Sequence, residues 1–95
     1  MYAVFKIPKS KLDVLENIYK DDSIGRQTIV KRDGKSLGLD DEGVYLLIEG
    51  SEPAVKKARE ILKEMELPPN DAEIVYAKIK ESEEEASLGM GAIFG

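Results

Sequence analysis

The sequence predicts an α+β fold in which a four-stranded antiparallel sheet carries two helices on one face. Apolar runs of strand character alternate with two amphipathic segments, in the order strand, helix, strand, strand, helix, strand. The two most apolar strands, Tyr2–Ile7 and Val44–Ile48, are those that this order places at the centre of the sheet. We therefore expect a ferredoxin-like βαββαβ sandwich.

Residues 44–65 predict a core strand that runs directly into an amphipathic helix. Val44–Ile48 is an apolar, β-branched-rich run between two glycines, which is typical of a strand buried on both faces or nearly so. Ser51 is placed to cap the free N–H groups of the helix start, and Glu52 favours the positive end of the helix dipole. The apolar residues that follow recur at helical spacing: Ala54, Val55, Ala58, Ile61, Leu62 and Met65.

The first strand and helix are indicated in the same way. Tyr2–Ile7 alternates between two faces, and Pro8 ends it because proline cannot donate to a sheet ladder. A helix from about residue 10 to residue 20 follows, and residues 21–25 then read as a loop. One face of this helix carries Leu12, Leu15, Ile18 and Tyr19.

A hairpin is predicted in the middle of the chain. Gln27–Arg32 is the second strand, and Asp33-Gly34 is a short turn signal. Residues 35–39 either return as a short strand or belong to a long exposed hairpin loop that reaches Gly43. The acidic cluster at residues 40–42 predicts a turn.

The end of the chain divides into a last strand and a tail. Leu67-Pro68-Pro69-Asn70 predicts the end of the second helix, and alternation over Glu73–Lys80 predicts the fourth strand. Residues 1–80, with 14 basic and 15 acidic side chains, form one nearly neutral domain. Residues 81–95 hold four glutamates and no basic residue, so we expect an acidic, flexible tail there.

Composition limits the possible chemistry. The chain contains no cysteine and no histidine, which excludes disulfides, thiolate nucleophiles and imidazole bases. We find no nucleophile–base pair, phosphate-binding loop or calcium-loop spacing, so we predict no catalytic residue, no metal site, no cofactor and no enzyme activity. No long apolar run and no signal-peptide pattern are present, so we expect a cytoplasmic protein that does not bind membranes.

Residues 44–65 resemble the closing strand and helix of KH RNA-binding domains. The similarity lies in Leu-Ile-Glu-Gly-Ser-Glu-Pro-Ala-Val-Lys-Lys-Ala-Arg-Glu-Ile-Leu, where an Ile-x-Gly step precedes a helix with Ala and Ile at matching spacing. KH domains hold the nucleic-acid backbone with a helix–Gly-x-x-Gly–helix element. Here Ile24-Gly25-Arg26-Gln27 is followed by Thr28, where the second glycine should stand. The resemblance therefore covers the part of a KH domain that packs, and not the part that binds.

A basic cluster on the predicted second strand is a candidate nucleic-acid surface. On an open sheet with exposed tyrosines, basic groups hold phosphates while the rings stack on bases. A solvated, charge-mixed surface is the alternative, because 15 acidic side chains are spread through the same domain. The possible nucleic-acid contacts are Arg26, Lys31, Arg32 and Lys35.

The C-terminal residues resemble the ends of archaeal and eukaryotic acidic ribosomal stalk proteins. Glu83-Glu84-Glu85-Ala86-Ser87-Leu88-Gly89-Met90-Gly91-Ala92-Ile93-Phe94-Gly95 is a Glu-rich run followed by a Leu-Gly-x-Gly-x-aliphatic-Phe-like terminus. The resemblance implies a flexible acidic run and an apolar end that docks on translational GTPases. The implied partner-binding residues are Leu88, Met90, Ile93 and Phe94. The alternative is a tail that folds back on the sheet or seals a dimer.

Two functions follow from these features. The first is a non-enzymatic adaptor connected with translation, with a candidate RNA contact, whose tail recruits a translation factor. The second is a dimeric small-molecule-binding or regulatory module that pairs through the open face of its sheet. The second is motivated by the outer face of the sheet, which would carry more large apolar residues than a solvated face should. These residues are Tyr2, Val4, Tyr45, Leu47, Ile74 and Tyr76.

Overall fold

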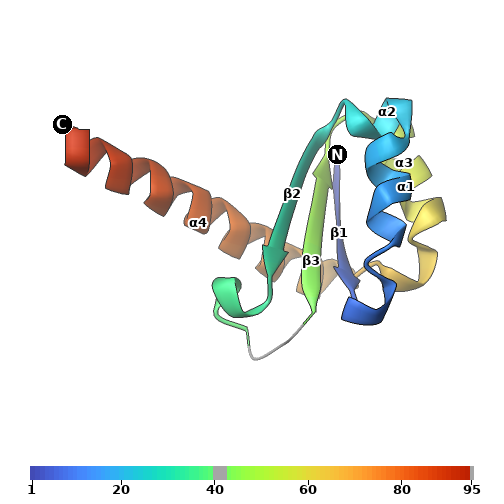
Figure 1. Ribbon diagram of the computed structural model, residues 1–95, viewed down its shortest axis with the longest axis horizontal. Coiled ribbons are helices and arrows are strands. Elements are labelled where there is room, and N and C mark those ends of the chain that lie inside the picture. The colour runs from blue at the N-terminus through green and yellow to red at the C-terminus, as the bar shows by residue number, and fades with distance from the viewer. Residues whose placement is uncertain (40–42, 95) are drawn as a thin grey trace.

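The computed structural model describes residues 1–39 and 43–94, with side chains up to Glu83. The chain is α+β, as predicted, with one antiparallel sheet of three strands in the order β1-β3-β2 (Figure 1). The strands are β1 (Tyr2–Ile7), β2 (Thr28–Asp33) and β3 (Val44–Glu49). Both outer strands pair with β3 along their whole length, so β3 alone occupies the centre of the sheet.

The predicted fourth strand is wrong. Glu73–Lys80 belongs to a helix, α4 (Pro69–Phe94). The alternation in this segment is short, and its buried or half-buried residues Ala72, Val75, Tyr76 and Ile79 fit the helical period equally well. Pro69 stands at the first helical position, where its missing N–H costs nothing. The chain therefore does not form the predicted four-stranded ferredoxin-like sheet.

β1 is an edge strand, although the sequence placed it at the centre. The Leu67 N–H donates to the Val4 carbonyl at 2.9 Å, and Phe5 forms an isolated antiparallel bridge with Glu66. Pro68 and Pro69 follow, and prolines have no N–H with which to continue a ladder. This short contact occupies the place where a fourth strand would begin.

Three helices cover one face of the sheet: α1 (Val14–Lys20), α2 (Asp22–Gly25) and α3 (Glu52–Ile61) (Figure 1). Their apolar side chains pack on those of β1 and β3 in one buried cluster. The cluster contains Ala3, Phe5, Ile7, Leu46 and Ile48 from the sheet and Leu15, Ile18, Ile24, Val55, Ala58 and Leu62 from the helical side.

The helical boundaries on this face differ in detail from the prediction. A 3-10 turn, η1 (Lys9–Lys11), precedes α1, so the predicted helix over residues 10–20 is split. Most of the loop predicted at residues 21–25 is α2. α3 is confirmed, but it ends at Ile61 and is followed by a 3-10 turn, η3 (Lys63–Met65).

The start of α3 is held by Gln27 and not by the predicted cap. The Ser51 side chain makes no cap hydrogen bond; instead the Ser51 N–H donates to Gln27 Oε1 at 3.0 Å. Gln27 Nε2 in turn donates to the Ser23 carbonyl at 3.0 Å, which ties α2 to α3. A Cβ at Gly50 would lie 1.9 Å from Gln27 Oε1, so this contact requires glycine.

α4 covers the opposite face of the sheet, which the sequence left open. Beneath α4, Tyr45 is 6% exposed and Leu47 is fully buried. Of the residues predicted to form an open apolar face, only Ile74 is largely exposed, at 54%. The buried cluster on this face comprises Val4, Leu37, Tyr45, Leu47, Val75 and Ile79. The protein therefore has three layers, with helices on both sides of the sheet.

The β2–β3 connection contains a 3-10 turn, η2 (Lys35–Leu37), and not the short strand considered above. Leu37 is buried against the α4 side of the sheet, so the connection is not fully exposed either. The Gly34 N–H donates to the Gly43 carbonyl at 3.0 Å and closes the loop. The acidic cluster at residues 40–42 lies outside the described residues.

α4 is longer than the sheet that it covers. Its 26 residues correspond to about 39 Å, close to the 43 Å longest dimension of the molecule. Its last turns extend past β2 (Figure 1). The domain boundary predicted at residue 80 falls inside this helix, and the flexibility of residues 81–95 stays a prediction. Within the described residues, no helix is both long and apolar enough to cross a bilayer.

We predict that α4 contributes to the stability of the whole fold. Ile79→Ala should lower the free energy of unfolding by about 2–5 kcal/mol, because the removed side chain is fully buried. Ile74→Ala, on an exposed position of the same helix, should change it by less than about 0.5 kcal/mol. Urea denaturation of both variants measures the difference. Equal effects would show that α4 does not pack on the sheet as described.

Candidate functional site

The four residues predicted to contact nucleic acid do not form one cluster. Arg26 precedes β2 and Lys35 follows it, so about 20 Å of strand separates them. Lys31 and Arg32 are neighbours in β2 and point to opposite faces of the sheet. Lys31 lies on the side of α1–α3 and Arg32 on the side of α4.

Two of these four basic residues already have partners. Arg26 pairs with Asp22 one helical turn earlier, at 3.3 Å. Arg32 Nη1 donates to the Lys31 carbonyl at 2.9 Å. The side chains of Lys31 and Lys35 are exposed on the outer strand and its turn. β2 thus offers a thin line of positive charge along an edge and not a basic groove.

The junction between α1 and α2 is a single residue, Asp21, and it carries a strong electrostatic contact. The Asp21 carboxylate accepts hydrogen bonds at 3.0 Å from the backbone N–H groups of Ser23 and Ile24. The Lys57 ammonium reaches it from α3 at 2.6 Å. The hydrogen bond from Lys57 and then those from Ile24 and Ser23 hold the pKa of Asp21 well below its usual range.

This junction bears on the KH resemblance. Residues 24–27, which the sequence aligned with the Gly-x-x-Gly loop, form the end of α2 and the link to β2, and do not lie between two helices. The loop between two helices is instead Asp21, a carboxylate. A negative charge that already occupies the N–H groups at the start of α2 repels a phosphate. The sequence signal that was missed is an N-cap aspartate directly before Asp22-Ser23-Ile24.

A second polar cluster fixes α4 to one end of the sheet. The Tyr76 hydroxyl donates to Glu49 Oε2 at 2.7 Å, and Lys80 Nζ lies 3.1 Å from Glu49 Oε1. The ring of Tyr76 stacks on that of Tyr2, with centroids 4.1 Å apart, and Lys80 Nζ lies 5.3 Å from the Tyr76 centroid. Sheet and helix residues therefore meet in one network.

The protonation behaviour of this cluster follows from its contacts. The hydrogen bond from Tyr76 lowers the pKa of Glu49, and the contact with Lys80 lowers it further. The same hydrogen bonds to Glu49 raise the pKa of Tyr76 and the pKa of Lys80. All three shifts stabilise the ionic state found at neutral pH, with Glu49 and Lys80 charged and Tyr76 protonated. The cluster thus holds α4 in place and leaves no group poised for proton transfer.

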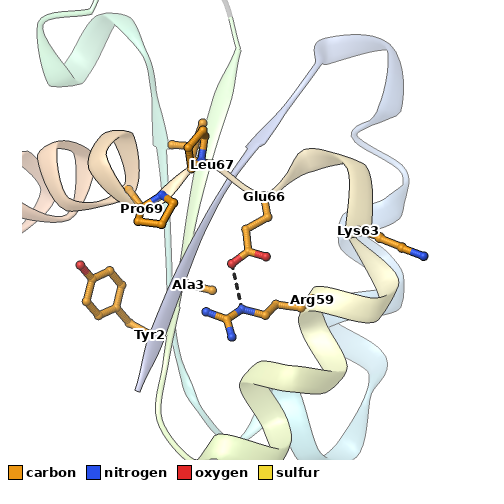
Figure 2. A pocket seen from close by; sticks show the side chains of 9 residues that line it. Tyr2, Ala3, Arg59, Lys63, Glu66, Leu67 and Pro69 are labelled. Carbon is orange, nitrogen blue, oxygen red and sulfur yellow. Dashed lines mark hydrogen bonds and ion pairs between the residues drawn. The ribbon is translucent and has the colours of Figure 1, made fainter.

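A hollow of about 540 Å³ lies beside β1, between α3 and the start of α4 (Figure 2). Arg59 extends across it and its Nε donates to Glu66 Oε2 at 2.8 Å. No local sequence pattern predicts this site, because its residues come from β1, α3, η3, α4 and the segment that precedes α4. Its lining consists of Tyr2, Ala3, Arg59, Lys63, Glu66, Leu67, Pro68, Pro69 and Ala72.

The predicted partner-binding residues fall at the far end of α4. The backbone there is helical up to Phe94, and the side chains beyond Glu83 are not described. Their part in binding stays a prediction. The four residues are Leu88, Met90, Ile93 and Phe94.

The described residues contain no group of three or more acidic side chains arranged to hold a metal ion. Comparisons of the chain with protein-family models, with curated proteins and with solved structures found no match.

We predict that Asp21 makes the stability depend on pH. Because its pKa is lower in the folded chain than the ordinary value of 3.8, its contribution is complete above that value and is lost as the pH falls below it. Asp21→Asn should therefore destabilise the protein at pH 7 and should flatten the loss of stability between about pH 5 and pH 2. Urea midpoints measured across this range test both effects.

Asp22→Asn is the matched control for this experiment. Asp22 is exposed, and within the described part of the chain its ion pair is with Arg26 just after α2, so its removal should leave the urea midpoint at pH 7 nearly unchanged. Identical pH profiles for the two variants would show that the Asp21–Lys57 contact is not formed in solution.

Proposed function

We propose that this chain is a non-enzymatic binding module connected with translation, in which a compact α+β body presents a C-terminal helix to a translation factor. The observation that supports this proposal is the path of α4. Its first half packs on the sheet, whereas its last turns extend past β2 (Figure 1). A partner can therefore reach the end of the helix without disturbing the core.

The attachment of α4 is firm enough for this role. Val75 and Ile79 are buried against the sheet, and Tyr76 and Lys80 bond to Glu49. Among the residues whose side chains are described, the last such contacts lie near residue 82, where α4 passes η2. The rest of α4 continues from this packed first half, and the packing sets the direction in which the end of the helix is presented.

The end of α4 has the chemistry of a reversible docking segment. Four glutamates between residues 81 and 85 precede the apolar residues that resemble the terminus of ribosomal stalk proteins. Gly89 and Gly91 each weaken a helix by about 1 kcal/mol relative to alanine, so ordering this segment on a partner has a cost. We therefore propose a weak, rapidly exchanging contact with a translational GTPase.

Deletion of Leu88–Gly95 should abolish the binding of an archaeal-type elongation factor in a pull-down. The melting temperature should stay nearly unchanged, because the described contacts that hold α4 to the sheet all precede this segment. A variant of full length with Leu88, Met90, Ile93 and Phe94 replaced by serine separates loss of apolar contact from loss of length. Unaltered binding by both variants would remove the proposal.

RNA contact is a second candidate. The element order supports it, because two consecutive helices, α1 and α2, separate the first two strands, and β3 and α3 resemble the closing strand and helix of KH domains. The carboxylate of Asp21 at the helix junction disfavours a phosphate grip there. We therefore propose that any contact with RNA uses the exposed lysines along β2.

The double variant Lys31→Gln, Lys35→Gln should weaken binding to single-stranded polyuridine by about tenfold in fluorescence anisotropy at low salt. Its charge-matched control is Lys56→Gln, Lys63→Gln, on and just after α3, which should bind like the unmodified chain. Binding that is absent at about 50 mM salt, or that responds equally to both double variants, would exclude this candidate.

The regulatory-dimer alternative has lost the feature that motivated it. The apolar sheet face that was expected to pair with a second copy is covered by α4, with Val4 and Leu47 fully buried. A dimer through that face would require α4 to leave the sheet and the Glu49–Tyr76 hydrogen bond to break.

A further inference from the structure

The N-terminal end of β1 presents backbone groups to the edge of the sheet. The Val4 carbonyl accepts from the Leu67 N–H, so the backbone of Val4 faces away from β3. In a strand, residues two apart face the same way, and the N–H and C=O of Tyr2 therefore also point outward. The Met1 carbonyl points the other way, because it accepts from the Gly50 N–H at 2.9 Å.

The neighbouring segment does not cover this end of the edge. Glu66 and Leu67 pair with β1 only around Val4 and Phe5. Pro68 and Pro69 then end the pairing and direct the chain into α4. Within the described residues, no strand lies beyond β1 at Tyr2.

A hollow of suitable size lies on this part of the edge. Its volume of about 540 Å³ is within the usual range for binding pockets, about 300–1,000 Å³. Ala3 forms its floor, and Leu67 and Pro69 form an apolar wall on the α4 side (Figure 2). Because Ala3 has a small side chain and the wall is apolar, the backbone of another chain can approach β1 closely.

Glu66 holds the Arg59 side chain in this hollow. The bond from Arg59 Nε to Glu66 fixes the guanidinium, which points from α3 towards β1, whereas the Lys63 side chain points away (Figure 2). This bond engages Nε and leaves the Nη side of the guanidinium towards the hollow. A guanidinium in this geometry donates two parallel hydrogen bonds to the oxygens of a carboxylate.

We infer that the hollow binds an extended segment of a partner protein, which adds to the β1 edge at Tyr2 and places an Asp or Glu side chain on Arg59. Strand addition supplies main-chain hydrogen bonds, and a side-chain pocket supplies selectivity. The lining carries two positive charges, Arg59 and Lys63, and one negative charge, Glu66, and this balance favours an acidic segment over a neutral one. This surface is separate from the end of α4, so the chain would connect two partners.

The test uses a phage-displayed library of random nonapeptides, selected on the immobilised full-length chain. The selected peptides should share an Asp or Glu at one position and should bind with micromolar affinity in isothermal titration calorimetry. Arg59→Gln should weaken binding at least tenfold. Lys56→Gln, which removes an exposed charge of α3 that is not in the lining of the hollow, should change binding less than twofold.

Two further measurements distinguish strand addition from a simple charge contact. N-methylation of the peptide amides, one at a time, should weaken binding at least tenfold at the amide that meets Tyr2, and should have little effect at the amides on either side. Glu66→Gln keeps the Arg59 charge and should bind the acidic peptides at least as tightly as the unmodified chain. It also shows whether Arg59→Gln acts merely by breaking the Arg59–Glu66 pair.

Several results would overturn the inference. These are the absence of any selected peptide tighter than 1 mM, selected peptides without an acidic position, or affinity unaffected by Arg59→Gln or by N-methylation. Amide shifts in NMR spectra that lie away from Tyr2 and Ala3 would do the same. So would a peptide-independent dimer in sedimentation that uses this edge, because a second copy would then be the occupant.

Discussion

The rest of the structure depends on the fact that β3 is apolar on both of its faces. From Val44 to Ile48, every side chain is at most 6% exposed, although successive residues point to opposite sides of the sheet. Such a strand needs cover on two sides, because leaving either side in water would cost the burial energy of several large side chains. α1–α3 provide one cover and α4 provides the other. This requirement places α4 on the sheet and makes the protein three layers thick.

The route that α4 takes is set by two prolines. The chain touches the edge of β1 at Glu66 and Leu67, where a fourth strand would begin, and then meets Pro68 and Pro69. Proline cannot continue a ladder but is well suited to the first turn of a helix. One local feature therefore ends the sheet, starts the helix that covers it, and leaves a hollow beside Tyr2. Both proposed binding surfaces result from this change of direction.

Charges at the helix junction are compensated within the chain. The helix junction that would hold a nucleic-acid backbone is instead satisfied from within, by Asp21 and Lys57. The basic residues of β2 are spread over an edge, while Arg59 is fixed inside a hollow by Glu66.

The sequence by itself determined β1, β2, β3 and α3, because each has a clear apolar period and is bounded by glycine or proline. It also indicated burial of Val44–Ile48 on both faces, which conflicts with an open sheet face and already required a second cover. It did not determine whether Glu73–Lys80 is a strand or a helix. The eight residues alternate as in a strand, but Val75, Tyr76 and Ile79 are also at helical spacing. Only the tertiary structure decided that this segment is helical, because the uncovered face of β3 selected the helix. Contacts such as Glu49–Tyr76 and Arg59–Glu66 were likewise decided there, since they join residues that no local period brings together.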